Sequence, residues 1–125
     1  MPEDKDELRE RYPYHRRFIR IKLRLRVLVA AGRSLQSWTQ NVSADGLCFE
    51  IPRRLEPEET VEVWLYPPQP ESSPVRARCR IVWRQPAVRG FRHGAQFIEF
   101  FDEGREQLLQ ILDALTRPPT QPPPP

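Results

Sequence analysis

Three arginines fall within five residues near the start of the chain, and they form its densest group of side chains suited to ligand chemistry. Arg16, Arg17 and Arg20 belong to the run His15-Arg16-Arg17-Phe18-Ile19-Arg20. A guanidinium group donates forked hydrogen bonds to phosphate, can bond the O6 and N7 edge of guanine, and offers a flat face for stacking. The cluster predicts contact with a ligand that carries phosphates and bases, and a basic cluster on a flexible arm without a specific ligand is the plainer alternative.

A second polar group lies in the run Asn41-Val42-Ser43-Ala44-Asp45-Gly46. Asn41 and Ser43 are two residues apart, and Gly46 permits a positive φ or a close approach of another backbone segment. The asparagine carbonyl can accept from a guanine, and the serine hydroxyl can donate to a phosphate. The alternative is an ordinary connection between strands, in which both side chains cap their own backbone.

Catalytic and metal-binding patterns are missing from the sequence. Two histidines, His15 and His93, are the only side chains suited to acid–base work near neutral pH, and no HExxH motif or phosphate-binding glycine loop occurs. Cys48 and Cys79 stand alone, without a zinc-type spacing, and are expected to be two buried thiols. We therefore expect no enzyme activity, no metal and no cofactor.

The elements that must position these side chains are mainly β-strands. Apolar and polar residues alternate in five or six segments, which is typical of half-buried strands. Strands this short and regular favour an antiparallel barrel, because closure removes exposed sheet edges. The expected strands span residues 21–29, 35–39, 47–51, 61–66, 75–84 and 91–101.

An amphipathic helix is expected after the last strand. Asp102 stands where an N-cap belongs, and Pro118 and Pro119 end the pattern. The helix would lie across the barrel with its apolar face down. That face is expected to carry Leu108, Leu109, Ile111, Leu112 and Leu115. The fold class predicted is mainly β, a six-stranded antiparallel barrel with a C-terminal helix.

The segment 75–84 has the cleanest alternation in the chain. One face carries arginines and must meet solvent, a ligand or a partner, and solvent is the plainer reading. The other face is apolar, and Trp83 is expected to share it with Ile81. The two sets are Arg76, Arg78, Arg80, Val82 and Arg84 on the first face, and Val75, Ala77, Cys79, Ile81 and Trp83 on the second.

Composition divides the chain into three parts. Residues 1–13 are highly charged and are expected to form a flexible arm, residues 14–116 a single domain, and the proline-rich residues 117–125 a disordered tail. The net charge is +3, which is low for a nucleic-acid binder and argues against that partner. No apolar run approaches the roughly 20 residues that span a bilayer, so we expect no membrane insertion and a cytoplasmic protein.

Taken together and in this order, the two polar groups resemble the PilZ domain family. Its signature is Arg-x-x-x-Arg followed by Asp/Asn-x-Ser-x-x-Gly, matched here by Arg16 and Arg20 and then by the run that ends at Gly46. Further along, Ile81-Val82-Trp83 is similar to the family's central strand, and Gly94-Ala95-Gln96-Phe97 to its Gly-x-Gln-Phe strand. The resemblance covers about residues 14–115.

The resemblance implies a six-stranded barrel and cyclic di-GMP as the ligand. Arg16 and Arg20 would hold phosphates and guanine edges, Asn41 would read a guanine, Ser43 would bond near a phosphate, and Gly46 would give clearance. Secondary contacts would come from His15, Arg17 and Trp83, and the stretch before the arginines would close over the ligand. The implied partner is an unidentified effector protein in motility, biofilm or exopolysaccharide control.

Two other hypotheses remain open at the level of sequence. One is a PilZ-like adaptor that binds proteins but not the nucleotide, which departures from the signature would favour; the motif positions show none. The other is a small barrel that binds single-stranded nucleic acid, with the arginines of residues 76–92 beside Trp64 or Tyr66. The low net charge argues against this last hypothesis.

Overall fold

A closed barrel of six antiparallel strands followed by one helix forms the part of the chain that the computed structural model describes, residues 22–69 and 71–116. The fold class predicted from the sequence is confirmed. The elements are β1 (Arg26–Ala30), β2 (Ser34–Val42), β3 (Gly46–Ile51), β4 (Thr60–Tyr66), β5 (Val75–Ala87), β6 (Gly90–Phe100) and α2 (Gly104–Thr116).

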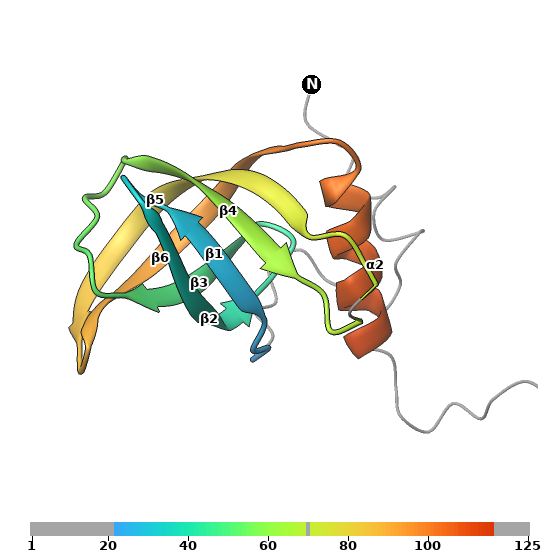
Figure 1. The fold of residues 1–125 in the computed structure, drawn as a ribbon, viewed down its shortest axis with the longest axis horizontal. Coiled ribbons are helices and arrows are strands. Elements are labelled where there is room, and N and C mark those ends of the chain that lie inside the picture. The colour runs from blue at the N-terminus through green and yellow to red at the C-terminus, as the bar shows by residue number, and fades with distance from the viewer. Residues whose placement is uncertain (1–21, 70, 117–125) are drawn as a thin grey trace, which may run out of the picture.

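The strands follow one another around the barrel in the order β1-β2-β3-β6-β5-β4, and pairing of β1 with β4 closes it. Consecutive strands therefore pair with one another except β3 and β4, and β3 pairs with β6 instead. The hairpin of β5 and β6 is the longest element and projects at the end away from α2 (Figure 1). Closure leaves none of the six strands with an open edge.

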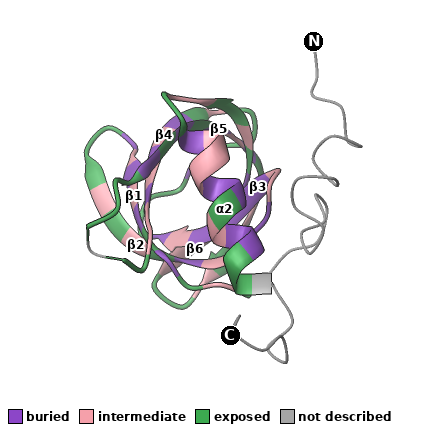
Figure 2. Cartoon of the chain, turned by 90° about the vertical axis from the view of Figure 1, so that its right-hand side faces the viewer, coloured by how far each residue is buried: buried purple, intermediate pink, exposed green. Residues whose placement is uncertain are grey.

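The core fills the inside of the barrel with the inward residues of each alternating strand. Val29, Phe49 and Leu65 have no exposed surface, and each comes from a different strand. The helix covers one end of the barrel, as the end-on view shows (Figure 2), and Leu108 and Leu112 join the same core. The expected placement of the helix with its apolar face down is confirmed for these two leucines.

The start and the end of the helix differ from the sequence prediction. Asp102 is not the N-cap, because it adopts a left-handed φ of 54° in the turn between β6 and α2. The first helical hydrogen bond runs from the Gln107 N–H to the Glu103 carbonyl (3.0 Å), so Glu103 is the capping residue. Leu115 lies outside the buried face, with 47% of its surface exposed. The apolar face therefore ends about one turn before the helix does.

The first strand is also shorter than its alternation predicted, beginning at Arg26 rather than at Ile21. Leu25 is buried in the expected sense, but the segment leading to it is held by a side chain instead of a full strand ladder. The Thr39 hydroxyl donates to the Leu23 carbonyl (2.6 Å) and accepts from the Leu25 N–H (2.8 Å). Thr39 thus ties the chain entering the barrel to β2, two residues before Asn41.

Candidate ligand-binding site

The turn between β2 and β3 is built around the hydroxyl of Ser43. The Ser43 Oγ accepts hydrogen bonds from the backbone N–H groups of Asp45 and Gly46, both at 3.2 Å, and the Ser43 N–H donates to the Gly46 carbonyl at 2.9 Å. Ser43 has only 1% of its surface exposed. Its hydroxyl is therefore engaged in shaping the turn, which is the backbone-capping alternative raised by the sequence.

Gly46 is the point where β3 comes closest to β6. A Cβ atom added there would lie 2.1 Å from the Ala95 carbonyl oxygen, a distance no real side chain tolerates. Of the two explanations that the sequence offered for this glycine, close approach of another backbone segment is the one observed, and the segment is a neighbouring strand. Gly46 fixes the packing of the turn against β6.

Asn41 stands at one end of a row of outward residues that crosses four strands. Asn41 pairs with Cys48, Cys48 with Gly94, and Gly94 with Trp83. Neighbouring strands are about 4.8 Å apart, so the three steps span about 14 Å. The two middle positions, Cys48 and Gly94, are buried, so the exposed parts of the row are the side chains at its two ends.

Trp83 owes its place at the other end of the row to a β-bulge. The pairing passes from Ile81–Ala95 to Trp83–Gly94, which leaves Val82 as an extra residue on β5. The expectation that Trp83 shares the inward face with Ile81 is therefore wrong. Trp83 turns outward, with 40% of its surface exposed. A second irregularity, at Gln40 in β2, lies beside Asn41 at the opposite end.

The indole of Trp83 lies directly over Gly94. A Cβ atom at Gly94 would be 2.1 Å from the indole Nε1 and 2.3 Å from Cε2. The glycine thus allows the ring to lie down along the sheet, toward Cys48 and Asn41. The sequence indicated Gly94 only as part of a strand motif and Cys48 only as a buried thiol, and it predicted neither as a part of this row. The signal that was available was the pairing of a glycine with a tryptophan in adjacent strands.

The arginines and the histidine of the first motif, Arg16, Arg17, Arg20 and His15, lie outside the described residues. What the structure gives is the point at which the chain reaches the barrel. Leu23 is bonded through Thr39 to β2, beside the bulge that precedes Asn41. Of the predicted site residues that the structure describes, Asn41 and the Ser43 turn are neighbours, and Trp83 lies at the other end of the row.

The arginine face of β5 is neutralised by carboxylates from β6, β4 and the loop before β4. Arg76, Arg78 and Arg80 lie partly exposed to solvent on this face, as the plainer reading of the sequence expected, whereas the bulge at Val82 places Arg84 opposite His93, on the other face of the strand. Each of the four arginines is paired with a glutamate. This pairing removes the basic groove that the nucleic-acid hypothesis needs. The hydrogen bond and charge of Arg84 lower the pKa of its partner, Glu56. The pairs are Arg76–Glu62 (3.0 Å), Arg78–Glu99 (3.0 Å), Arg80–Glu58 (3.7 Å) and Arg84–Glu56 (2.9 Å).

His93 is enclosed next to the row, on the inner side of β6. Its Nε2 accepts from the Leu55 N–H at 3.0 Å, and its ring stacks on Phe49 with centroids 5.5 Å apart. Burial, helped by the positive charge of Arg84, lowers the pKa of His93. The imidazole is therefore a neutral packing group with no access to solvent.

The two thiols and the acidic groups form no metal site in the part of the chain described. Cys48 and Cys79 are both buried and unbridged, and burial raises the pKa of the Cys79 thiol. Within residues 22–69 and 71–116, no three side chains of histidine, cysteine, aspartate or glutamate gather as metal ligands do. Within the same residues, no helix is long and apolar enough to cross a membrane.

The fold is a closed six-stranded barrel with a helix over one end. The PilZ domain model matches residues 14–114, and the chain therefore belongs to the PilZ domain family. This confirms the resemblance read from the two motifs. The family is known for binding cyclic di-GMP, and its members are typically receptor or adaptor domains rather than enzymes.

Solved structures agree in fold. The Bacillus subtilis inhibitor of motility, MotI/DgrA, aligns with a TM-score of 0.67 at 15% identity, over 80% of this chain and 50% of that one. The PilZ domain of CeSA from a cellulose-synthesizing bacterium aligns with a TM-score of 0.59 at 14% identity, over 79% of this chain and 99% of that one. The chain thus spans about half the length of the first of these. No curated protein matches the sequence.

Proposed function

We propose that the protein is a receptor for cyclic di-GMP that signals to a partner protein. Arg16 and Arg20 hold the phosphates and guanine edges of the nucleotide, and Asn41 reads a guanine. His15, Arg17 and Trp83 make secondary contacts. The proposal assigns no catalytic step to any of these groups and needs no metal or cofactor.

The observation that carries the proposal is the outward row from Asn41 to Trp83. Its length of about 14 Å suits a flat dinucleotide lying along the sheet. The half-exposed indole of Trp83, which covers Gly94, offers a stacking face for a base. Asn41 at the far end supplies the hydrogen-bonding groups that a guanine edge requires.

The entry of the chain at Leu23 supports a joint site for the two motifs. Leu23 is three positions after Arg20, and a chain segment of that length spans at most about 10 Å. Leu23 is bonded to Thr39, which is two residues from Asn41. Arg20 and Asn41 are therefore within reach of one ligand of dinucleotide size.

Ser43 and Gly46 are assigned a supporting part in this site. Because the Ser43 hydroxyl accepts two backbone N–H groups, its main contribution is to hold the turn that follows Asn41. Gly46 contributes the close packing of that turn against β6. Both motif residues would then matter for binding through the position of Asn41 and of the surrounding backbone.

Signalling follows from a difference in affinity between two arrangements of the N-terminal region. We propose that residues 1–13 act as an arm on a domain of residues 14–116, with residues 117–125 as a separate tail. A nucleotide that binds better when the arm is closed shifts the population toward that form and changes the surface offered to an effector. Since the second messenger is met in the cytoplasm, we assign the protein to that compartment.

Isothermal titration with cyclic di-GMP tests the proposal. We expect saturable binding by the full chain, loss of binding in Arg16→Ala/Arg20→Ala, and full binding in the matched pair Arg33→Ala/Arg89→Ala, which lies in two hairpins away from the row. GTP serves as the nucleotide control. If about millimolar ligand produces neither heat nor a thermal shift, the receptor hypothesis is wrong, because that concentration is well above the weak end of specific affinities. An adaptor that does not bind the nucleotide would then be the best remaining hypothesis.

A further inference from the structure

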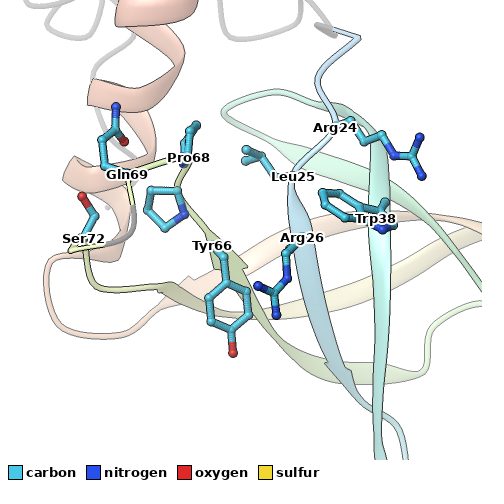
Figure 3. A pocket seen from close by; sticks show the side chains of 9 residues that line it. Arg24, Leu25, Arg26, Trp38, Tyr66, Pro68, Gln69 and Ser72 are labelled. Carbon is cyan, nitrogen blue, oxygen red and sulfur yellow. The ribbon is translucent and has the colours of Figure 1, made fainter.

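A second outward face, on β1, also carries arginines beside aromatic rings. Arg26 pairs with Trp38 of β2 on one side and with Tyr66 of β4 on the other. The guanidinium of Arg26 lies 5.3 Å from the centroid of Tyr66, and that of Arg24 lies 5.0 Å from the centroid of Trp38. We call these four residues the β1 arginine face (Figure 3).

A hollow of about 510 Å³ lies at this face. Its far wall is the loop after β4, which carries prolines and neutral polar groups, while the side chain of Arg24 points away from that loop, past Trp38 (Figure 3). No aspartate or glutamate contributes to the lining described. The wall residues are Pro67, Pro68, Gln69 and Ser72, and Leu25 forms the floor.

The cations of the β1 arginine face have no counter-charge within residues 22–69 and 71–116. Neither Arg24 nor Arg26 forms an ion pair there, whereas Arg76, Arg78, Arg80 and Arg84 on β5 are each paired with a glutamate. One guanidinium face is covered by an aromatic ring, and its N–H edges remain available for an acceptor. Among the residues that the structure describes, the barrel thus has one arginine face paired with glutamates and one without such pairs.

We propose that the β1 arginine face docks an extended, acidic segment of a partner protein. Arg24 and Arg26 are two residues apart in extended chain, which separates them by about 6.6 Å. That spacing is between Cα atoms, and the two guanidinium groups lie over rings on either side of β1, Trp38 of β2 and Tyr66 of β4. An extended peptide that carries acidic side chains along its length brings separate carboxylates to the two groups. Arginine, tryptophan and tyrosine are also the residues most enriched at energetic centres of protein interfaces.

A nucleic-acid strand fits this face less well. Binding to a phosphate backbone depends on many neutralised phosphates, and the face offers two uncompensated arginines. Base stacking needs open ring faces, and here a guanidinium lies over each ring. The proposal is independent of the nucleotide site, because none of the four residues belongs to the row from Asn41 to Trp83.

The test is fluorescence anisotropy with a labelled peptide of alternating glutamate and serine, titrated with the full chain at about 50 mM salt, where ionic contacts are weakly screened. We expect Arg24→Gln/Arg26→Gln to weaken binding by about tenfold or more. The matched control is Arg76→Gln/Arg78→Gln, which also removes two alternating arginines that lie over aromatic rings. We expect this pair to change the affinity by less than about twofold, because its charges are already neutralised.

Three results would overturn the proposal, and unfolding curves would first establish that each variant is folded. The first is equal weakening by both arginine pairs. The second is tighter binding of a single-stranded DNA of the same length than of the peptide. The third is loss of cyclic di-GMP binding, without loss of peptide binding, in Arg24→Gln/Arg26→Gln, which would make the face part of the nucleotide site. An isomeric peptide with its glutamates in one block should bind less tightly. Equal binding of the two peptides would contradict a requirement for carboxylates that are separated along the peptide.

Discussion

The two ends of the row across the barrel are built in different ways. The Asn41 end is held by local hydrogen bonds, from Ser43 to groups two and three residues away, in a turn that is largely buried. The Trp83 end is held by contacts between distant parts of the chain, through a bulge in β5 and a glycine in β6. The first end belongs to the framework of the fold, and the second is open to a ligand.

This difference separates stability from affinity. Substitutions in the turn should act mainly on the free energy of unfolding, because the groups they remove are buried and bonded to backbone. Substitutions at Trp83 should act mainly on ligand affinity, because 40% of that side chain is exposed and nothing in the core depends on its far edge. Variants at the two ends should therefore differ in whether they change the free energy of unfolding or the ligand affinity.

The largest effect is expected for Gly46→Ala. Its new methyl group would lie 2.1 Å from the Ala95 carbonyl oxygen, and a paired backbone cannot move aside as a flexible side chain can. We expect a loss of about 3 kcal/mol or more in the free energy of unfolding, measured in urea.

Gly104→Ala is the matched control, since its nearest contact would be 3.1 Å, at the Arg76 carbonyl oxygen, and alanine is favoured in helices. That variant should stay within about 1 kcal/mol of the parent. Equal costs for the two variants would show that the turn does not depend on the close approach of β3 to β6.

The next effect is expected for Ser43→Ala, which removes the acceptor of two backbone N–H groups. Leaving a buried donor without a partner costs about 1–3 kcal/mol, and we expect a loss in that range. Ser34→Ala, at an exposed position at the start of β2, should change the free energy of unfolding by less than about 0.5 kcal/mol. A stable Ser43→Ala variant that has lost only nucleotide affinity would instead make the hydroxyl a ligand contact.

At the other end, Trp83→Ala is expected to weaken cyclic di-GMP binding while sparing the fold. Stacking of a base on an aromatic side chain contributes about 1–3 kcal/mol, so the dissociation constant should rise by about tenfold or more. Trp38→Ala is the control, because Trp38 is similarly exposed, at 45%, but belongs to the β1 arginine face. An equal loss of affinity in both variants would indicate that the ligand binds closer to β1 than to the row.

Sequence reasoning was most successful where structure depends on local pattern. Alternation predicted all six strands, and the separation of Asn41 and Ser43 predicted a turn in which a side chain caps the backbone. It failed where distant segments set the outcome. The bulge at Val82, which turns Trp83 outward, depends on the pairing of β5 with β6, and nothing in the alternation of residues 75–84 signals it. Likewise, the glutamates that neutralise the β5 arginines come from other strands and from the loop before β4.

The helix start shows the same limit on a smaller scale. Asp102 has the side chain of an N-cap, but the chain must reverse direction after β6 to lay α2 over the barrel. The turn that accomplishes this uses a left-handed φ at Asp102 and passes the capping position to Glu103. Residue preference predicted where the helix begins to within two residues, and the geometry of the connection decided the rest.

The smallest effect is expected from a change of pH on the free energy of unfolding. The group responsible is His93, which precedes Gly94 at the Trp83 end of the row. Because burial lowers the pKa of His93, the stability it contributes is fully present above its ordinary pKa of about 6.5. It is lost as the pH falls below that value toward the lowered pKa. Protonation would place a proton on Nε2 opposite the Leu55 N–H, a donor against a donor. We therefore expect the free energy of unfolding to be flat from pH 8 to about 7 and to fall between about pH 6.5 and 5.

Urea unfolding at several pH values measures this fall, and His93→Gln is the control that should lack it in the same range. Glu56 does not obscure the result, because the hydrogen bond and charge of Arg84 hold its pKa below the ordinary value of 4.5. If the parent and His93→Gln decline in parallel between about pH 6.5 and 5, the imidazole is not the titrating group. In that case the inner side of β6 tolerates a charge, and the Trp83 end is less rigid than its glycine contact implies.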